Sequence, residues 1–175
     1  MLLLNKKSRL EPNSFQNGGF IKMTEITFLA SSKPFEIPDE IEEYNHRTIF
    51  EREENCISFT VEEIGDYWEK EVAGLFSLPY IYEVNGVGNR LFLTYIEKYM
   101  EIGDVFEIYT VPDQHAFEYH KQNMQENSNP IEVNVGSYTY RDIYGLYQLN
   151  IKKWIEDLSH RNYCTHHGIT TFVKC

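Results

Sequence analysis

A glycine-rich segment stands between a predicted strand and a predicted helix, and its residue types suit an anionic ligand. The segment reads Asn85-Gly86-Val87-Gly88-Asn89-Arg90. Glycines let a phosphate approach backbone N–H groups, the start of a helix favours negative charge, and Arg90 adds a fork of donors. Gly86, Gly88, Asn89 and Arg90 are therefore candidates for binding a phosphate-bearing or other anionic ligand.

The same segment is only a fragment of a dinucleotide-binding fingerprint. That fingerprint requires a third glycine, and Leu91 occupies the corresponding position. Glu83, in the preceding strand, would repel a phosphate if its side chain faced the loop. The alternative is an ordinary glycine-rich connection in which Asn89 caps the following helix.

Thiol and imidazole groups near the C-terminus suggest a second kind of site. His160, Cys164, His166 and His167 carry ligand types that Zn²⁺ prefers, and positions 160 and 164 share a helix face. Cys175 is a candidate fourth ligand, but no second CxxC or HxxxH pair completes a known spacing. The alternative is a polar helix end whose cations meet the helix dipole favourably. We expect no cofactor, and no local signature supports Cys164 as a nucleophile.

Carboxylates crowd about one fifth of the chain. Thirteen Asp and Glu residues lie between positions 36 and 71, and they form no DxD or EF-hand pattern. The usual interpretation is a solvated acidic face. A sharper hypothesis is a surface for a basic protein partner, in which aromatic anchors lie among the acids. Its candidate residues are Glu42, Glu43, Tyr44, Tyr67 and Trp68.

The charge of the chain is distributed unevenly. The formal net charge is −11, but residues 24–142 hold 24 acids and 8 bases, and residues 143–175 hold 4 bases and 2 acids. An acidic body of this kind disfavours direct binding to nucleic acid, whose phosphates require Lys and Arg, and binding to an anionic membrane. The opposite signs of the two regions make a basic partner, or head-to-tail assembly into a homo-oligomer, physically reasonable.

Length and composition predict one domain. A chain of 175 residues with 13 Tyr and 11 Phe can bury an ordinary core, roughly 70% of its unfolded surface. The three cysteines form no spacing framework, which favours reduced thiols and a cytoplasmic location. No stretch approaches the roughly 20 apolar residues of a membrane span.

The first 22 residues differ from the rest in charge and pattern. Residues 1–23 hold four bases and one acid, and loop-forming residues dominate them. Gly18 and Gly19 stand shortly before Met23, and two adjacent glycine codons can spell a bacterial ribosome-binding sequence. Two interpretations stay open: residues 1–22 are a translated leader before a native start at Met23, or Met1 is the start and they are a disordered tail. The predicted domain covers residues 23–175.

Periodicity predicts a single α+β domain with about four helices. Several strands alternate polar and apolar residues, which favours a mixed or mostly antiparallel sheet over an all-parallel one. The predicted strands cover 25–30, 57–64, 80–84, 105–111, 131–135, 138–140, 146–149 and 169–173. Of these, 138–140 and 146–149 are expected to pair as a hairpin around a turn at 142–145. The predicted helices cover 66–77, 90–101, 114–126 and 150–163, with a short helix or turn at 39–45. Asp66 and Asn150 are the predicted caps of the first and the last of the four.

Together these features predict a small acidic bacterial protein of the cytoplasm that is not an enzyme and that binds a basic partner. The alternative is a small enzyme or ligand-binding domain that holds an anion at the Asn85–Arg90 loop.

Overall fold

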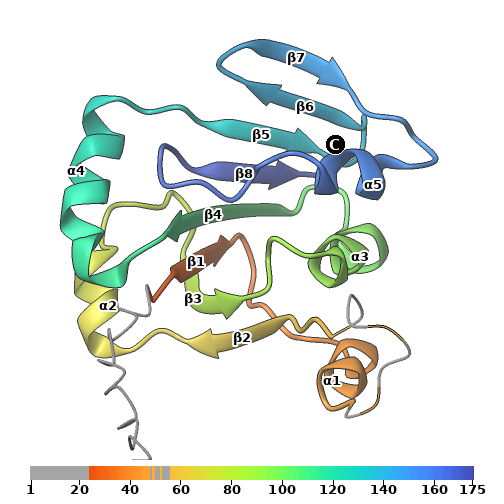
Figure 1. Cartoon of the computed structure of the whole chain (residues 1–175), viewed down its shortest axis with the longest axis horizontal. Helices are drawn as coiled ribbons and strands as arrows, with labels where there is room; N and C mark the ends of the chain where they lie inside the picture. Colours follow the sequence, from red (N-terminus) through yellow and green to blue (C-terminus); the bar gives the residue numbers. More distant parts are fainter. Residues whose placement is uncertain (1–23, 48, 50–51, 53–55) are drawn as a thin grey trace, which may run out of the picture.

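The centre of the computed structural model is one eight-stranded sheet (Figure 1). The structure describes residues 24–47, 49, 52 and 56–175, so the predicted leader or tail lies outside it. In chain order the strands are β1 (Ile26–Ser31), β2 (Thr60–Glu63), β3 (Tyr80–Asn85), β4 (Val105–Val111), β5 (Ile131–Asn134), β6 (Thr139–Asp142), β7 (Gly145–Gln148) and β8 (Thr170–Val173).

Across the sheet the strand order is β2-β3-β1-β4-β8-β5-β6-β7. Among the described strands, all neighbours are antiparallel except β5 and β8, which are parallel. The predicted mixed, mostly antiparallel sheet is confirmed. β2 and β7 are its two edges, which makes them the strands with backbone groups open to another chain.

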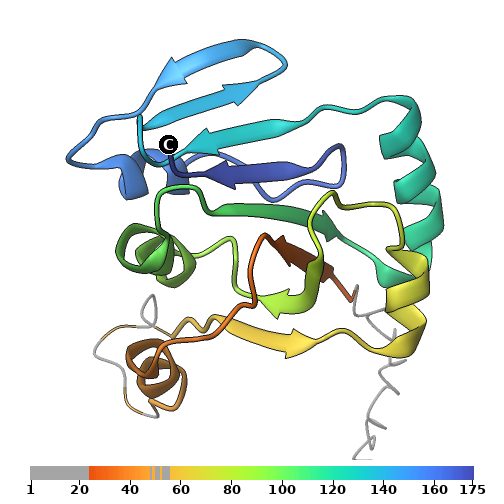
Figure 2. The same ribbon diagram turned by 180° about the vertical axis from the view of Figure 1, so that it is seen from behind.

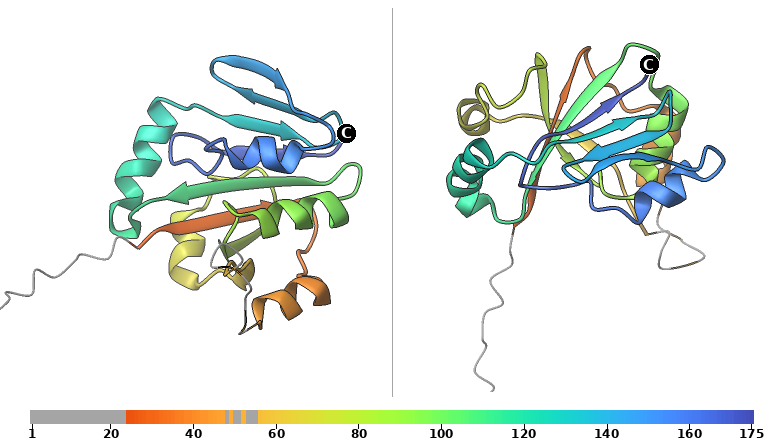
Figure 3. Two further views of the ribbon diagram at one scale, coloured as in Figure 1. Left: turned by 45° about the vertical axis from the view of Figure 1, so that its right-hand side comes forward. Right: turned by 90° about the horizontal axis from the view of Figure 1, so that it is seen from above.

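Helices cover both faces of the sheet. They are α1 (Asp39–Asn45), α2 (Asp66–Glu71), α3 (Arg90–Tyr99), α4 (Phe117–Glu126) and α5 (Trp154–Ser159), with a 3₁₀ turn η2 (Gln114–Ala116) before α4. Figure 3 shows α2 and α4 on one side of the sheet and the other three helices on the opposite side. In the part of the chain that the structure describes, no helix is both long and apolar enough to span a membrane.

The central strand β1 serves both layers of the core. All six of its residues are buried, because its neighbours β3 and β4 cover its edges and helices cover its faces. Successive side chains of a strand point to opposite faces. Phe28 accordingly packs in the cluster with α2 and α4, whereas Leu29 packs in the larger cluster with the other helices. This explains why β1 reads as an apolar run without alternation.

Helix α3 forms where the sequence predicts it. The Oδ1 atom of Asn89 accepts hydrogen bonds from the N–H groups of Leu91 (2.9 Å) and Phe92 (3.3 Å), so Asn89 is the predicted N-cap. The buried face includes Leu91, Phe92, Tyr95 and Ile96, as the period of 3.6 residues requires. The helix ends at Tyr99, two residues earlier than predicted.

Two other predicted helices are shorter in the structure. The prediction for 66–77 is wrong in length and cap: α2 ends at Glu71, and Gly65 is its N-cap. The prediction for 150–163 is also too long, since α5 spans only Trp154–Ser159. The side chain of Asn150 accepts a hydrogen bond from the N–H of Lys152 (3.0 Å), which stabilises a local turn in place of helix.

The predicted strand 57–64 is shortened for a related reason. Asn45, at the end of α1, donates from Nδ2 to the carbonyl of Phe59 (2.7 Å) and accepts from its N–H (3.0 Å) at Oδ1. The amide side chain thereby takes both backbone groups of Phe59, and the ladder with β3 begins only at Thr60. This contact fixes α1 against the start of β2.

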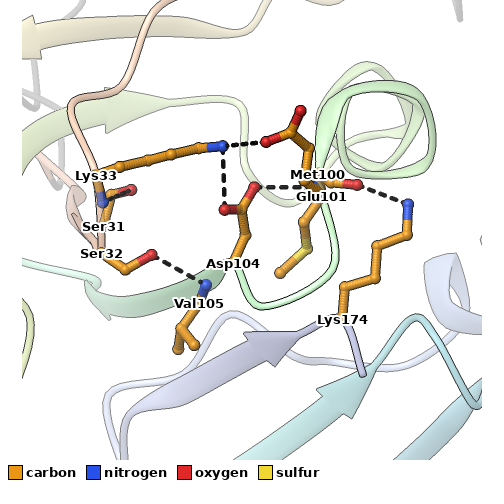
Figure 4. Close-up of polar contacts among 8 residues, drawn as sticks. All are labelled: Ser31, Ser32, Lys33, Met100, Glu101, Asp104, Val105 and Lys174. Atoms are coloured by element: carbon orange, nitrogen blue, oxygen red, sulfur yellow. Dashed lines mark hydrogen bonds and ion pairs between the residues drawn. The ribbon is translucent and has the colours of Figure 1, made fainter.

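A polar cluster between β1 and the turn after α3 was not predicted from the sequence (Figure 4). Lys33 Nζ lies 2.8 Å from a carboxylate oxygen of Glu101 and 3.1 Å from one of the buried Asp104. The hydrogen bond to Glu101, followed by that to Asp104, raises the pKa of Lys33. Lys174 Nζ donates to the carbonyl of Met100 (2.6 Å). The cluster fastens the α3–β4 turn to β1 and to the C-terminal segment.

Candidate functional site

The glycines of the 85–90 segment have roles in packing. Gly86 has φ of +85°, and a Cβ built on it would overlap the carbonyl oxygen of Ser58. A Cβ on Gly88 would lie 3.6 Å from Cys164 Sγ. Only glycine suits position 86, because any other residue would be strained at this positive φ and its Cβ would overlap the backbone of Ser58.

Polar groups of this segment also bond within the protein. Besides capping α3, Asn89 donates from Nδ2 to the carbonyl of Ser58 (2.7 Å). The buried hydroxyl of Tyr163 donates to the carbonyl of Val87 (2.6 Å). The N–H groups of Leu91 and Phe92, which a phosphate at the helix start would use, already have Asn89 as their acceptor.

The exposed Arg90 contributes instead to a cleft between α3 and α5. This cleft has a volume of about 470 Å³. It is lined by Arg90, Thr94, Lys152, Lys153, Ile155, Glu156 and Ser159. Three cations thus stand around one carboxylate, that of Glu156, which lies 3.8 Å from Lys153 Nζ. On a chain of net charge −11, this is a local concentration of positive charge.

The four candidate zinc ligands occupy different surroundings. His160 lies at the exposed end of α5, where Nδ1 is 2.7 Å from the carbonyl oxygen of Glu156. Cys164 packs beside Gly88, and burial raises the pKa of its thiol to about 12. Among the described residues, no group of three or more His, Cys, Asp or Glu side chains could hold a metal ion. A protonated thiol is also a poor nucleophile.

His166 and His167 belong to a different group, together with His120 of α4. The ring centroids of His166 and His167 are 4.0 Å apart, and those of His166 and His120 are 4.7 Å apart. The pKa of His166 is lowered mainly by burial and to a smaller extent by the nearby His167 and His120. The neutral form of His166 is therefore favoured in the folded protein.

The five residues predicted to face a basic partner are divided between the two ends of β2. Figure 2 shows α1, which carries Glu42, Glu43 and Tyr44, at one end of this strand and α2, which carries Tyr67 and Trp68, at the other. The sequence interval between them is short, but the extended segment around β2 separates them.

The candidate residues also differ in exposure. Glu42 and Glu43 are exposed, and Tyr67 keeps 66% of its surface. Trp68 instead packs into the core, with its ring centroid 5.2 Å from that of Phe117. Tyr44 packs against the larger core cluster beneath the guanidinium of Arg47, 4.7 Å from its ring centroid. The two aromatic rings at Trp68 and Tyr44 therefore contribute to folding.

Acid-lined clefts lie beside the edge strand β2 on both faces of the sheet. The first, of about 300 Å³, is called here the α1-side cleft and is lined by Phe35, Ile37, Glu42, Val61, Glu62, Glu63 and Tyr82. The second, of about 330 Å³, is the α2-side cleft and is lined by Glu63, Ile64, Glu69, Val72, Pro79, Tyr80, Ile81 and Tyr82. Among the described residues, no Lys, Arg or His lines either cleft.

The sequence signal for these clefts was incomplete. Glu62, Glu63 and Glu69 belong to the acidic run, but nothing in the run distinguishes them from their neighbours. Phe35 and Tyr82 come from separate segments, and they meet because β3 pairs with β2 and the N–H of Phe35 donates to the hydroxyl of Tyr82 (3.0 Å). One sequence signal was available. Glu62 and Glu63 lie near the end of the alternating strand predicted at 57–64, and charged residues of this kind are typical of an edge strand in a sheet.

Comparisons of the chain with protein-family models, with curated proteins and with solved structures found no match.

Proposed function

We propose that this protein is a non-enzymatic binding protein that captures a basic protein partner along the edge strand β2. The observation that carries the proposal is the pair of acid-lined clefts on the two sides of this open strand. The raised thiol pKa of Cys164 argues against this cysteine as a nucleophile. Three free cysteines suit a reducing compartment, so we assign the protein to the cytoplasm.

An extended segment of the partner suits this edge. A strand added beside β2 would hydrogen-bond to its backbone, and successive side chains of that strand would point alternately to the two faces of the sheet. One set of side chains would meet the α1-side cleft, and the next set would meet the α2-side cleft. Long basic residues at both sets of positions would therefore meet carboxylates on either face.

The lining of the α1-side cleft suits a basic side chain in particular. Tyr82 and Val61 offer an apolar wall for the aliphatic stem of Lys or Arg, and Glu42 and Glu63 offer charge to its head. Complementary charge raises the rate of encounter and selects the partner. A protein whose own surface is basic because it binds nucleic acid is a partner of the right kind.

The test uses a fluorescent peptide of alternating Arg and Thr as the probe. We expect binding, measured by fluorescence anisotropy, to weaken about tenfold between 50 and 300 mM salt, because exposed charges are screened. The double variant Glu62→Gln with Glu63→Gln should raise the dissociation constant about tenfold or more, equivalent to about 1.4 kcal/mol.

The matched control removes two acids elsewhere. Glu126→Gln with Glu132→Gln makes the same change in net charge, at the end of α4 and on β5. It should leave the dissociation constant within about twofold of the wild type. An equal loss in both double variants would show attraction to overall charge only, and absence of peptide binding would refute the proposal.

A second candidate function follows from the cleft between α3 and α5. We propose that Arg90, with Lys152 and Lys153, can hold a phosphate-bearing anion there. The guanidinium supplies a planar fork for two phosphate oxygens, and the lysines add point charges. Such an anion would lie beside the first turns of α3, at the Arg90 end of the segment indicated by the sequence.

A thermal-shift titration tests this second candidate. Pyrophosphate at about 100 times its dissociation constant should add about 2.7 kcal/mol of stability, which raises the melting temperature by about 6 °C in a chain of this size. Arg90→Gln should abolish most of the shift. Arg141→Gln, which removes an exposed cation from β6, should retain it. A flat titration of the wild type would exclude the site.

A further inference from the structure

Exposed apolar side chains concentrate at the edge of the sheet opposite to β2. This group, called here the hairpin patch, comprises Ile143, Tyr144, Leu146, Tyr147 and Ile151. The first two form the turn between β6 and β7, and Figure 1 shows this hairpin at the far edge of the sheet. Tyr144 keeps 82% of its surface and Leu146 keeps 59%. Scattered apolar residues are ordinary on a surface, but exposed apolar residues gathered along one edge strand and the two segments that flank it indicate an interface.

The two edges of the sheet are protected very differently. β2 ends in Glu62 and Glu63, both exposed, and charges of this kind prevent a second strand from pairing unspecifically. β7 reads Gly-Leu-Tyr-Gln, with neither a charge nor a proline, and all four residues are exposed. An uncharged, apolar edge lacks the usual devices against pairing, so it is suited to pair.

The backbone of β7 has donors and acceptors directed to the open side. The N–H of Leu149 donates to the carbonyl of Tyr138 (2.8 Å), which continues the ladder with β6. In an antiparallel pair, successive residues direct their backbone groups to opposite sides. The N–H and C=O of Leu146 and Gln148 therefore face away from β6, toward a further strand.

The inner side of the hairpin is already held in place. The guanidinium of Arg161 lies over the rings of both Tyr140 (4.7 Å) and Tyr147 (4.9 Å), one from each strand. The Nε2 of Gln148 donates to the carbonyl of Tyr138 (2.9 Å). Because these contacts fix the hairpin before any partner arrives, little ordering entropy opposes pairing.

We infer that the β7 edge is a dimer interface, in which β7 pairs with β7 of a second copy around a two-fold axis. An antiparallel, two-fold pairing is self-complementary: centred on Tyr147, it places the outward backbone groups of Leu146 opposite those of Gln148 of the partner subunit. One continuous sheet then runs through both copies.

Charge favours a second copy as the occupant of this edge. Two chains of net charge −11 repel each other least where they carry no charge, and β7 carries none. The acidic edge β2 lies seven strand spacings away, about 33 Å along the sheet, and the Debye length at physiological salt is only about 8 Å. A β7-to-β7 dimer also leaves both β2 edges open at its two ends.

Sedimentation equilibrium on the full chain, between about 1 and 100 μM, tests this inference. We expect a monomer–dimer equilibrium in the wild type and a rise of about tenfold or more in the dimer dissociation constant for Leu146→Lys. The substitution places a charge on the edge strand and brings two like charges to diagonal positions on one face of the joined sheet. Ile102→Lys is the matched control. It adds the same charge at an even more exposed apolar residue, in the α3–β4 turn, and should leave the equilibrium unchanged.

Hydrogen exchange distinguishes edge pairing from a contact through side chains alone. The amides of Leu146 and Gln148 should become protected as the dimer fraction rises, because they acquire acceptors in the second copy. A wild type that stays monomeric at about 100 μM, or a dimer that tolerates Leu146→Lys, would overturn the inference. So would a dimer in which these two amides exchange as fast as in the monomer. The inference is independent of partner binding at β2, which the peptide assay measures separately.

Discussion

Replacing Gly86 by Ala should lower the free energy of unfolding by about 3 kcal/mol or more. An alanine there must adopt φ of +85°, and its Cβ would overlap the carbonyl oxygen of Ser58 and lie 2.7 Å from Nδ2 of Asn89. The overlapping carbonyl belongs to a backbone that cannot rotate away as a side chain can. We expect the melting temperature, followed by circular dichroism, to fall by about 6 °C or more.

Gly74→Ala separates the two causes of this loss. Gly74 also has positive φ, +76°, but a Cβ built on it meets nothing within 4 Å. Its substitution should therefore cost only the strain of an alanine in the left-handed backbone conformation, about 1 kcal/mol. Equal losses at the two positions would mean that the approach of Gly86 to Ser58 is unimportant, contrary to our account of the 85–90 segment.

Replacing Phe92 by Ala should cost about 3–5 kcal/mol, the largest effect that we expect from a single core side chain. Phe92 is fully buried on α3. Its ring lies edge-on to those of Phe59 (5.2 Å between centroids) and Phe172 (5.5 Å), so it joins α3 to the segment before β2 and to β8. Urea unfolding of purified protein measures the loss.

Phe92→Leu is the control for shape and volume. A leucine keeps most of the apolar volume and should cost less than about 1.5 kcal/mol. If Phe92→Ala cost no more than Phe92→Leu, the site would have collapsed onto the cavity, and Phe92 would not be the anchor of α3. Because Arg90 lies on the same helix, Phe92→Ala should also weaken any anion binding in the cleft between α3 and α5.

The two proposals assign different binding roles to the two edges of the sheet. The charged edge, β2, has clefts that suit basic side chains, and the uncharged edge, β7, suits a second copy of the chain. A dimer built at β7 would present two acidic edges to a partner with repeated basic segments. Binding at two such sites is tighter than at one when the spacing of the partner's sites matches.

Local signals were sufficient for some elements and not for others. α3 could be predicted because Asn89 caps it and its apolar residues recur every three or four positions. The start of α5 and the start of β2 could not, because the side chains of Asn150 and Asn45 compete for backbone groups, and a sequence pattern does not show which hydrogen bond is stronger. The β6–β7 hairpin was predicted because its two strands alternate around a short turn.

The candidate sites depended more on tertiary structure than the elements did. Tyr67 and Trp68 lie close to Tyr44 in the acidic run. In the fold, α2, which carries the first two, lies at the other end of strand β2 from α1, and Trp68 packs into the core. Conversely, Arg90 and Lys152 are 62 positions apart and line one cleft, because α3 packs against α5. Residues close in sequence were thus separated in the fold, and residues far apart in sequence were brought into one cleft.

The sequence by itself determined the acidic balance, the cap and buried face of α3, the hairpin, and the mostly antiparallel sheet. These follow from the composition and from the apolar patterns within single segments, both of which are visible in the sequence. Only the tertiary structure decided which strands are edges, which carboxylates line clefts, and which apolar residues remain exposed. Those properties depend on the strand order β2-β3-β1-β4-β8-β5-β6-β7, and that order is set by packing between distant segments.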